Sequence, residues 1–115
     1  ATDDCPFPAQ TRRLGKLLLD HLENGLEEAG YPLQDRELRS DRWSDCDGCP
    51  SSHLFLLGPA QEPRHPRASA MPGVIIEAMY VTSPVEAEQL LMDRVREVIA
   101  LAYADALTEY LTTQP

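Results

Sequence analysis

The sequence predicts an α/β fold, in which a mixed sheet is flanked by helices. Two short apolar runs, 54–57 and 74–76, end at or are bounded by Gly and Pro, which is typical of strands buried on both faces. Two longer stretches, 11–29 and 93–111, repeat their apolar residues at the period of a helix. We therefore expect at least two strands and three helices, with the third helix between the last strand and residue 93.

The first predicted helix covers residues 11–29. Gly30 is well placed to stop it, and Pro32 cannot continue it. Acidic residues such as Asp20 and Glu23 lie off its apolar face. That face consists of Leu14, Leu17, Leu18, Leu22, Leu26 and Ala29.

Two helices are predicted at the C-terminal end. Ser83 can cap the shorter one, with Pro84 at its first position and Glu86 at its third, so that Ser83 and Glu86 satisfy backbone amides reciprocally. This helix is expected to end at Leu91 or Met92. The longer helix, 93–111, has as its apolar side Val95, Val98, Ile99, Ala102, Ala106, Leu107, Tyr110 and Leu111.

Three segments of the single predicted domain, 1–115, are expected to be irregular. Residues 1–10 form an irregular first segment, and residues 36–52 form a polar loop insertion that contains cysteines. Residues 59–72 hold four of the ten prolines and are expected to form a loop that leads into the run 74–76.

The composition limits the classes of partner. With 43% hydrophobic and 25% charged residues, the chain has the composition of a soluble globular protein. No apolar run approaches the roughly 20 residues of a membrane-spanning helix. The formal net charge of −9 argues against nucleic acid, because it repels the phosphate backbone.

Glu77 is the candidate catalytic residue. It ends the apolar run 74–76, and α/β sheets place their chemistry at the carboxyl ends of their strands. A carboxylate there can take a proton from a water and pass it to a leaving group. On the pattern alone, the alternative of a solvated glutamate just after a strand is the favoured interpretation.

Residues 72–86, PGVIIEAMYVTSPVE, resemble the zinc-dependent N-acetylmuramoyl-L-alanine amidases of bacterial cell-wall metabolism, amidase type 3. That family carries a strand P-x-V-L-V-E, a loop G-F-x-S-N-P-x-E and a long closing helix. Met79 replaces the usual glycine and Ser83 the usual asparagine. The matching residues are Pro72, Val74, Ile75, Ile76, Glu77, Tyr80, Pro84 and Glu86.

The resemblance implies a peptidoglycan hydrolase outside the cytoplasm, secreted, periplasmic or in the cell wall. It would cleave the amide between N-acetylmuramic acid and L-alanine of the stem peptide, with Glu77 as general base and acid. The family's zinc ligands, two histidines and a glutamate, lie in the N-terminal half of the domain. Because His21, His53 and His65 have no metal-ligand spacing, we assign no zinc ligand to this chain. The chain would then be the C-terminal part of the domain, with the zinc ligands supplied by an N-terminal half as its partner.

Three residues are candidates for contact with a muropeptide. Tyr80 stands at the family's aromatic position, and Arg36 can pair with a stem-peptide carboxylate. His65 could reach the substrate or an oxyanion, although an exposed loop histidine between two prolines is the favoured interpretation.

The cysteines allow several interpretations. Cys46 and Cys49 form one C-x-x-C, and Cys5 stands alone. A structural zinc site with Cys5, Cys46, Cys49 and His53 lacks the second C-x-x-C of a zinc ribbon. Acidic neighbours disfavour a redox motif. A disulfide is favoured in an exported protein, either Cys46 with Cys49 or one of them with Cys5.

Two other functions stay open. The chain could be a non-catalytic module of the same architecture that binds peptidoglycan or regulates a cell-wall hydrolase; Met79 and the lack of metal ligands motivate this alternative. A weaker alternative is a related zinc carboxypeptidase or amidohydrolase that acts on a different amide.

Overall fold

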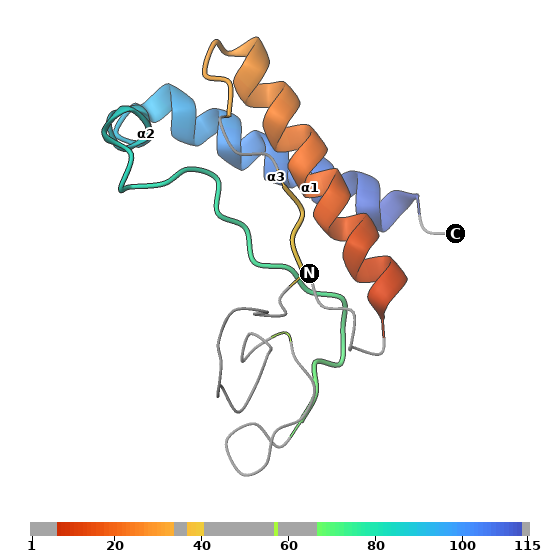
Figure 1. Cartoon of the computed structure of the whole chain (residues 1–115). Coiled ribbons are helices and arrows are strands. Elements are labelled where there is room, and N and C mark those ends of the chain that lie inside the picture. The colour runs from red at the N-terminus through yellow and green to blue at the C-terminus, as the bar shows by residue number, and fades with distance from the viewer. Residues whose placement is uncertain (1–6, 34–36, 41–56, 58–66, 114–115) are drawn as a thin grey trace, which may run out of the picture. The chain divides into compact units, whose positions relative to one another are not determined.

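The computed structural model describes residues 7–33, 37–40, 57 and 67–113 (Figure 1). It contains the helices α1 (Pro8–Glu28), α2 (Pro84–Leu90) and α3 (Asp93–Thr112). Helices make up 61% of the described residues, and no strand or sheet occurs among them. The predicted α/β fold with a mixed sheet is therefore wrong for the part of the chain that the structure describes.

The run 74–76 is the clearest departure from the predicted strands. These residues have no regular secondary structure, and Ile75 and Ile76 are 52% and 38% exposed where burial on both faces was expected. In the other predicted strand, residues 54–56 lie outside the described residues, and Leu57 is buried in a turn. A β-branched run favours an extended backbone, but a strand also needs a neighbour that supplies its ladder of hydrogen bonds. No described segment pairs with 74–76 in this way.

The chain divides into two compact units, each made of two stretches of sequence. The first comprises Ala1–Gly15 with Leu38–Ile75, and the second Lys16–Glu37 with Ile76–Pro115. In the first unit, the backbone of Gly15 comes close to Leu38: a Cβ atom at Gly15 would lie 2.6 Å from Leu38 Cδ1. The second unit contains most of α1 and all of α2 and α3.

The core of the second unit lies between α1 and α3. Its buried members are Leu22 and Leu26 from α1 and Val95 and Ala102 from α3. Gly25 lets the two helices approach closely, since a Cβ atom there would lie 3.3 Å from Val98 Cγ1. The partly buried side chains around this core are Tyr31, Leu33, Ala78, Met79, Val98, Ile99 and Tyr103. Burial raises the pKa of the Tyr103 phenol above its ordinary value of 10.0, so the core carries no charge from it.

Helix α1 confirms the first predicted helix and its stop, but it begins at Pro8, within the segment 1–10 that was expected to be irregular. Gly30 has φ +86°, a left-handed conformation that costs little only at glycine. The Gly30 amide donates to the Glu27 carbonyl at 3.0 Å and the Tyr31 amide to the Leu26 carbonyl at 2.8 Å, which is the Schellman pattern. Of the predicted apolar face, the buried residues are Leu14, Leu18, Leu22 and Leu26.

Helices α2 and α3 confirm the two C-terminal predictions to within one or two residues. The turn between them is closed by Arg96, whose guanidinium donates to the Leu90 carbonyl at 2.7 Å and pairs with Asp93. On α3, the predicted apolar side is only partly buried. Val95, Ala102, Ala106 and Tyr110 are buried. Leu107 and Leu111, which belong to the same predicted apolar side, are exposed.

Candidate functional site

Glu77 lies on the segment that leads into α2 (Figure 1). Its side chain is exposed, while Ala78 and Met79, which follow it, pack against the core between α1 and α3. Met79 therefore anchors the segment through its side chain at the position where the amidases have glycine. The carboxylate of Glu77 is accessible to a ligand and sits directly beside a fixed point of the backbone.

A capped turn fixes the backbone immediately after Glu77. The Glu86 carboxylate accepts from the Tyr80 amide at 2.5 Å, and the Ser83 amide donates to the Tyr80 carbonyl at 3.0 Å. The Glu86 amide donates to Ser83 Oγ at 3.5 Å. Glu86 is 8% exposed, so this carboxylate is a buried structural group. The predicted cap is confirmed at Ser83, but Glu86 reaches Tyr80 and not the Ser83 amide, because that amide is already used in the turn.

We expect Glu86→Gln to lower the free energy of unfolding by about 1–2 kcal/mol, because it weakens a charge-assisted hydrogen bond of a buried group. Ser83→Ala should cost about 1 kcal/mol as the loss of a helix cap. Urea unfolding followed by circular dichroism measures both. Glu88→Gln, an exposed position on the same helix, is the control and should change stability by less than about 0.5 kcal/mol. Equal effects at positions 86 and 88 would contradict the structural role of Glu86.

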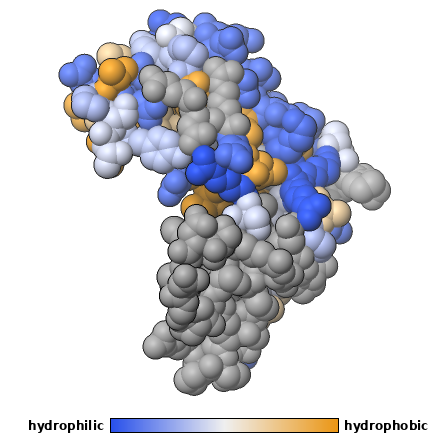
Figure 2. All heavy atoms as spheres, viewed as in Figure 1, coloured by the Kyte–Doolittle hydropathy of each residue, from blue (hydrophilic) through white to orange (hydrophobic). Residues whose placement is uncertain are grey.

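Apolar side chains surround this segment on the surface. Ile76 is 38% exposed, Tyr80 42%, Val81 77% and Val85 56%. Hydrophobic residues are visible at the surface where α2 lies in Figure 2. Exposed apolar side chains close together in the sequence and next to a polar group make this segment a candidate surface for a partner or a ligand.

The structure describes two of the predicted site residues, Glu77 and Tyr80, and places them three positions apart on one segment. The other candidates lie outside the described residues. They are Arg36 and His65 for substrate contact, and Cys5, Cys46 and Cys49 for a disulfide.

Two further properties concern the described part of the chain. Within it, no group of three or more His, Cys, Asp or Glu side chains could hold a metal ion. None of its helices is both long enough and apolar enough to cross a membrane.

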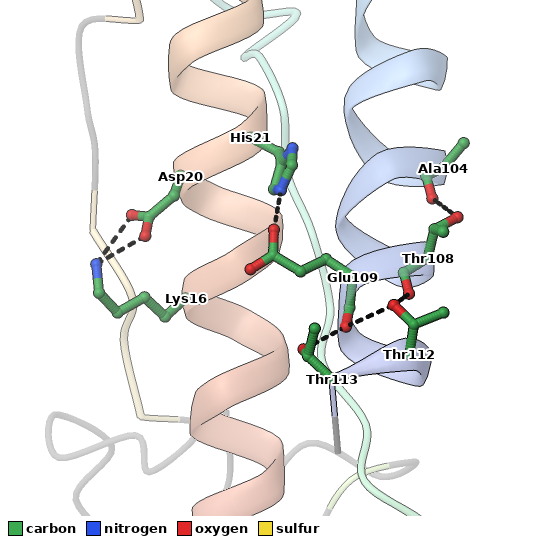
Figure 3. A network of polar contacts seen from close by, with 8 residues as sticks. All are labelled: Lys16, Asp20, His21, Ala104, Thr108, Glu109, Thr112 and Thr113. Carbon is green, nitrogen blue, oxygen red and sulfur yellow. Dashed lines mark hydrogen bonds and ion pairs between the residues drawn. The ribbon is translucent and has the colours of Figure 1, made fainter. Parts of the chain in front are cut away.

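One contact that the sequence did not reveal joins α1 to α3 (Figure 3). His21 Nε2 lies 2.8 Å from Glu109 Oε2, and the two side chains are 30% and 47% exposed. The contact is a hydrogen bond with a neutral imidazole and an ion pair with a protonated one. His21 lies at the edge of the apolar face of α1. A polar residue at that edge can reach the helix that packs on the face, and this placement could have indicated the contact.

A double-mutant cycle with His21→Ala and Glu109→Ala should give a coupling energy of about 0.2–1 kcal/mol, the usual range for a partly exposed pair. Thermal or urea unfolding of the four proteins measures it. Lys16 and Asp20, an exposed pair within α1 at 2.9 Å, provide the matched cycle for a contact that joins no second helix. A coupling energy of zero for His21 and Glu109 would mean that the contact does not stabilise the fold.

No family model, curated protein or solved structure matches the chain. The likeness to the amidases consequently depends on residues 72–86 themselves. The exposure of Glu77 and the capped turn after it are observations that do not depend on that likeness.

Proposed function

We propose that this chain contributes Glu77 to the active site of a zinc-dependent peptidoglycan amidase that a second polypeptide part completes. The reaction is hydrolysis of the amide between N-acetylmuramic acid and L-alanine. The proposal places the protein outside the cytoplasm, where this substrate is found. The observation that carries it is the exposed Glu77 carboxylate on a backbone fixed on its C-terminal side by Met79 and by the capped turn.

The surroundings of Glu77 support the need for a partner. Ile76, Tyr80 and Val81 are substantially exposed within four residues of this carboxylate. An amide substrate would lie open to water on such a surface. A second polypeptide part that covers the apolar side chains would exclude water from one side of the carboxylate and leave room for the substrate on the other.

The chemistry assigned to Glu77 is proton transfer. The carboxylate takes a proton from the attacking water as the water oxygen bonds to the scissile carbonyl carbon. The resulting acid then gives that proton to the departing nitrogen of L-alanine, so that the C–N bond breaks with a neutral amine leaving. One carboxylate serves both steps, since the nitrogen lies next to the carbon that was attacked.

Zinc, which the resemblance implies, does not fit the described residues alone, because no cluster of ligands for it occurs among them. As the resemblance implies, we assign its binding to the N-terminal half of the domain, and we derive no step of the reaction through it. The residues of this chain hold the proton-transferring group and one wall of the site.

The test is reconstitution. The chain is co-expressed with its upstream coding region or mixed with the corresponding polypeptide, and stem peptides released from purified peptidoglycan are analysed by mass spectrometry. We expect new peptides with a free L-alanine amine only when both parts and zinc are present. Reconstituted protein that binds zinc but releases no such peptide would overturn the amidase proposal.

A second candidate is a non-catalytic module that binds peptidoglycan or regulates a cell-wall hydrolase. Met79 favours it, because this side chain packs into the core where the amidases have glycine, so the segment around Glu77 need not follow the catalytic path. Co-sedimentation with intact peptidoglycan distinguishes the two. Binding that persists in the reconstituted protein without peptide release would support the module and not the enzyme.

A further inference from the structure

The side chains of Tyr31 and Met92 join the end of α1 to the start of α3. The Tyr31 hydroxyl donates to the Met92 sulfur at an O···S distance of 3.7 Å. Tyr31 follows the glycine that ends α1, and its side chain packs against the core between α1 and α3. Met92 directly precedes α3, and its carbonyl accepts from the Val95 and Arg96 amides. A chemical change at the Met92 sulfur therefore acts where these two helices are held together.

The Met92 side chain is open to reagents in solution. Met92 is 44% exposed, whereas Met79 is half-buried and packs against the core. Met71, the third methionine of the chain, is 68% exposed on an irregular segment. Oxidants convert accessible methionines to methionine sulfoxide. Met71 and Met92 should therefore react before Met79, and Met92 reacts at a sulfur that a phenol already contacts.

We propose that Met92 is an oxidation site, and that its sulfoxide strengthens the contact with Tyr31 and tightens the connection between α1 and α3. The oxidant is a peroxide such as hydrogen peroxide. A lone pair of the sulfur attacks one peroxide oxygen, and the S–O bond forms as the O–O bond breaks. The departing hydroxide takes the proton of the transferred oxygen and leaves as water. The sulfur loses two electrons and the peroxide gains them, and methionine sulfoxide reductases reverse the change.

The distance between the two side chains suits a sulfoxide oxygen. A thioether sulfur is a weak acceptor, whereas the sulfoxide is polar and presents an oxygen to the donor. An O–H···O hydrogen bond is roughly 2.7 Å long. The observed O···S distance of 3.7 Å is longer than this by about 1 Å. An oxygen bonded to the sulfur at an angle therefore fits between the sulfur and the phenol while both side chains keep their places.

The partial exposure of Met92 lowers the cost of the added oxygen. At Met92 the sulfoxide oxygen can accept from Tyr31 with one lone pair and stay in contact with water with the other. At Met79 the same oxygen would lose water against the apolar core, which destabilises a polar group that finds no hydrogen bond. Oxidation should therefore stabilise the fold at position 92 and destabilise it at position 79.

The experiment compares oxidised and reduced protein with and without the Tyr31 hydroxyl. The whole chain and its Tyr31→Phe variant, which keeps the aromatic ring, are treated with hydrogen peroxide. Treatment stops when peptide mass spectrometry finds sulfoxide at positions 71 and 92 and none at 79. Urea unfolding then gives the ratio of folded to unfolded protein. Oxidation should raise this ratio about two- to tenfold more in the unchanged chain than in Tyr31→Phe, the range expected for one hydrogen bond.

Three controls locate the effect. Met92→Leu should show no such rise, because peroxide then modifies position 71 without position 92. Tyr103→Phe removes a different phenol hydroxyl that belongs to a side chain packed against the same core, about 16 Å along α3 from Met92. This variant should respond to oxidation as the unchanged chain does. Methionine sulfoxide reductases should restore the original ratio.

Sulfoxide that forms at Met79 before Met92 would overturn the proposal, because Met92 would then not be an accessible oxidation site. So would an effect of oxidation that is the same with and without the Tyr31 hydroxyl, since the sulfoxide would then not bind Tyr31. A larger loss of stability in the unchanged chain than in Tyr31→Phe would also overturn it, because oxidation would then break the contact.

Discussion

Leu26→Ala should lower the free energy of unfolding by about 2–5 kcal/mol, the largest effect that we expect from any single change in the core. Leu26 is 0% exposed and packs with Leu22, Val95 and Ala102. The neighbouring Gly25 already brings α1 close to α3, so the helices have little room to collapse into the cavity. Since a domain of this size is typically stable by about 5–15 kcal/mol, the loss is a large fraction of the total.

Chemical unfolding of the purified chain followed by far-ultraviolet circular dichroism measures this loss. Leu91→Ala is the matched control, because it makes the same chemical change at a leucine that is 79% exposed. It should alter stability by less than about 0.5 kcal/mol. If the two variants were equally stable, Leu26 would not belong to a packed core in solution.

The helices were predictable because their signals are local. Gly30 stops α1 by its own left-handed conformation, and Ser83 caps α2 through a residue three positions away. Neither signal depends on what packs against the helix. The apolar period of α1 was also sufficient to identify its core, since a single side of that helix is apolar.

The strands were not predictable because their formation depends on partners far away in the sequence. The run 74–76 has the composition of a buried strand, but Ile75 and Ile76 are exposed and without a neighbouring strand among the described residues. The buried extent of the apolar side of α3 was not predictable for a related reason. Leu107 and Leu111 have the same apolar character as buried Val95, and composition cannot say which of two apolar sides meets α1.

In the candidate site, the helix cap was predictable from the sequence, but the contacts and exposure of the residues before it were not. The cap at Ser83 and Glu86 follows from residue types and spacing, whereas the contact of Glu86 with the Tyr80 amide depends on a turn that no pattern specified. Glu77 is exposed, which agrees with a solvated glutamate, but it follows an irregular run and not a buried strand. Its proposed catalytic role depends on the second polypeptide part that the proposal invokes.

Glu77→Gln should reduce amide hydrolysis by the reconstituted protein by about 10²–10⁴-fold, the usual contribution of general acid–base catalysis. Glutamine keeps the shape of the side chain but cannot take a proton from water at neutral pH. Initial rates of stem-peptide release measure the effect. Glu88→Gln is the control, since Glu88 is an exposed glutamate on α2 outside the segment that carries Glu77, and this variant should retain full activity.

The same variant must leave the fold intact for the result to concern catalysis. Glu77 is exposed, so Glu77→Gln should change the free energy of unfolding by less than about 0.5 kcal/mol, in contrast to Leu26→Ala. Binding of peptidoglycan should also be retained, because the amide side chain still offers an oxygen and adds hydrogen-bond donors. Activity lost with stability and binding unchanged would assign proton transfer to Glu77. Near-full activity in the reconstituted Glu77→Gln protein would remove Glu77 from the reaction and leave the segment 76–86 as a surface for a partner alone.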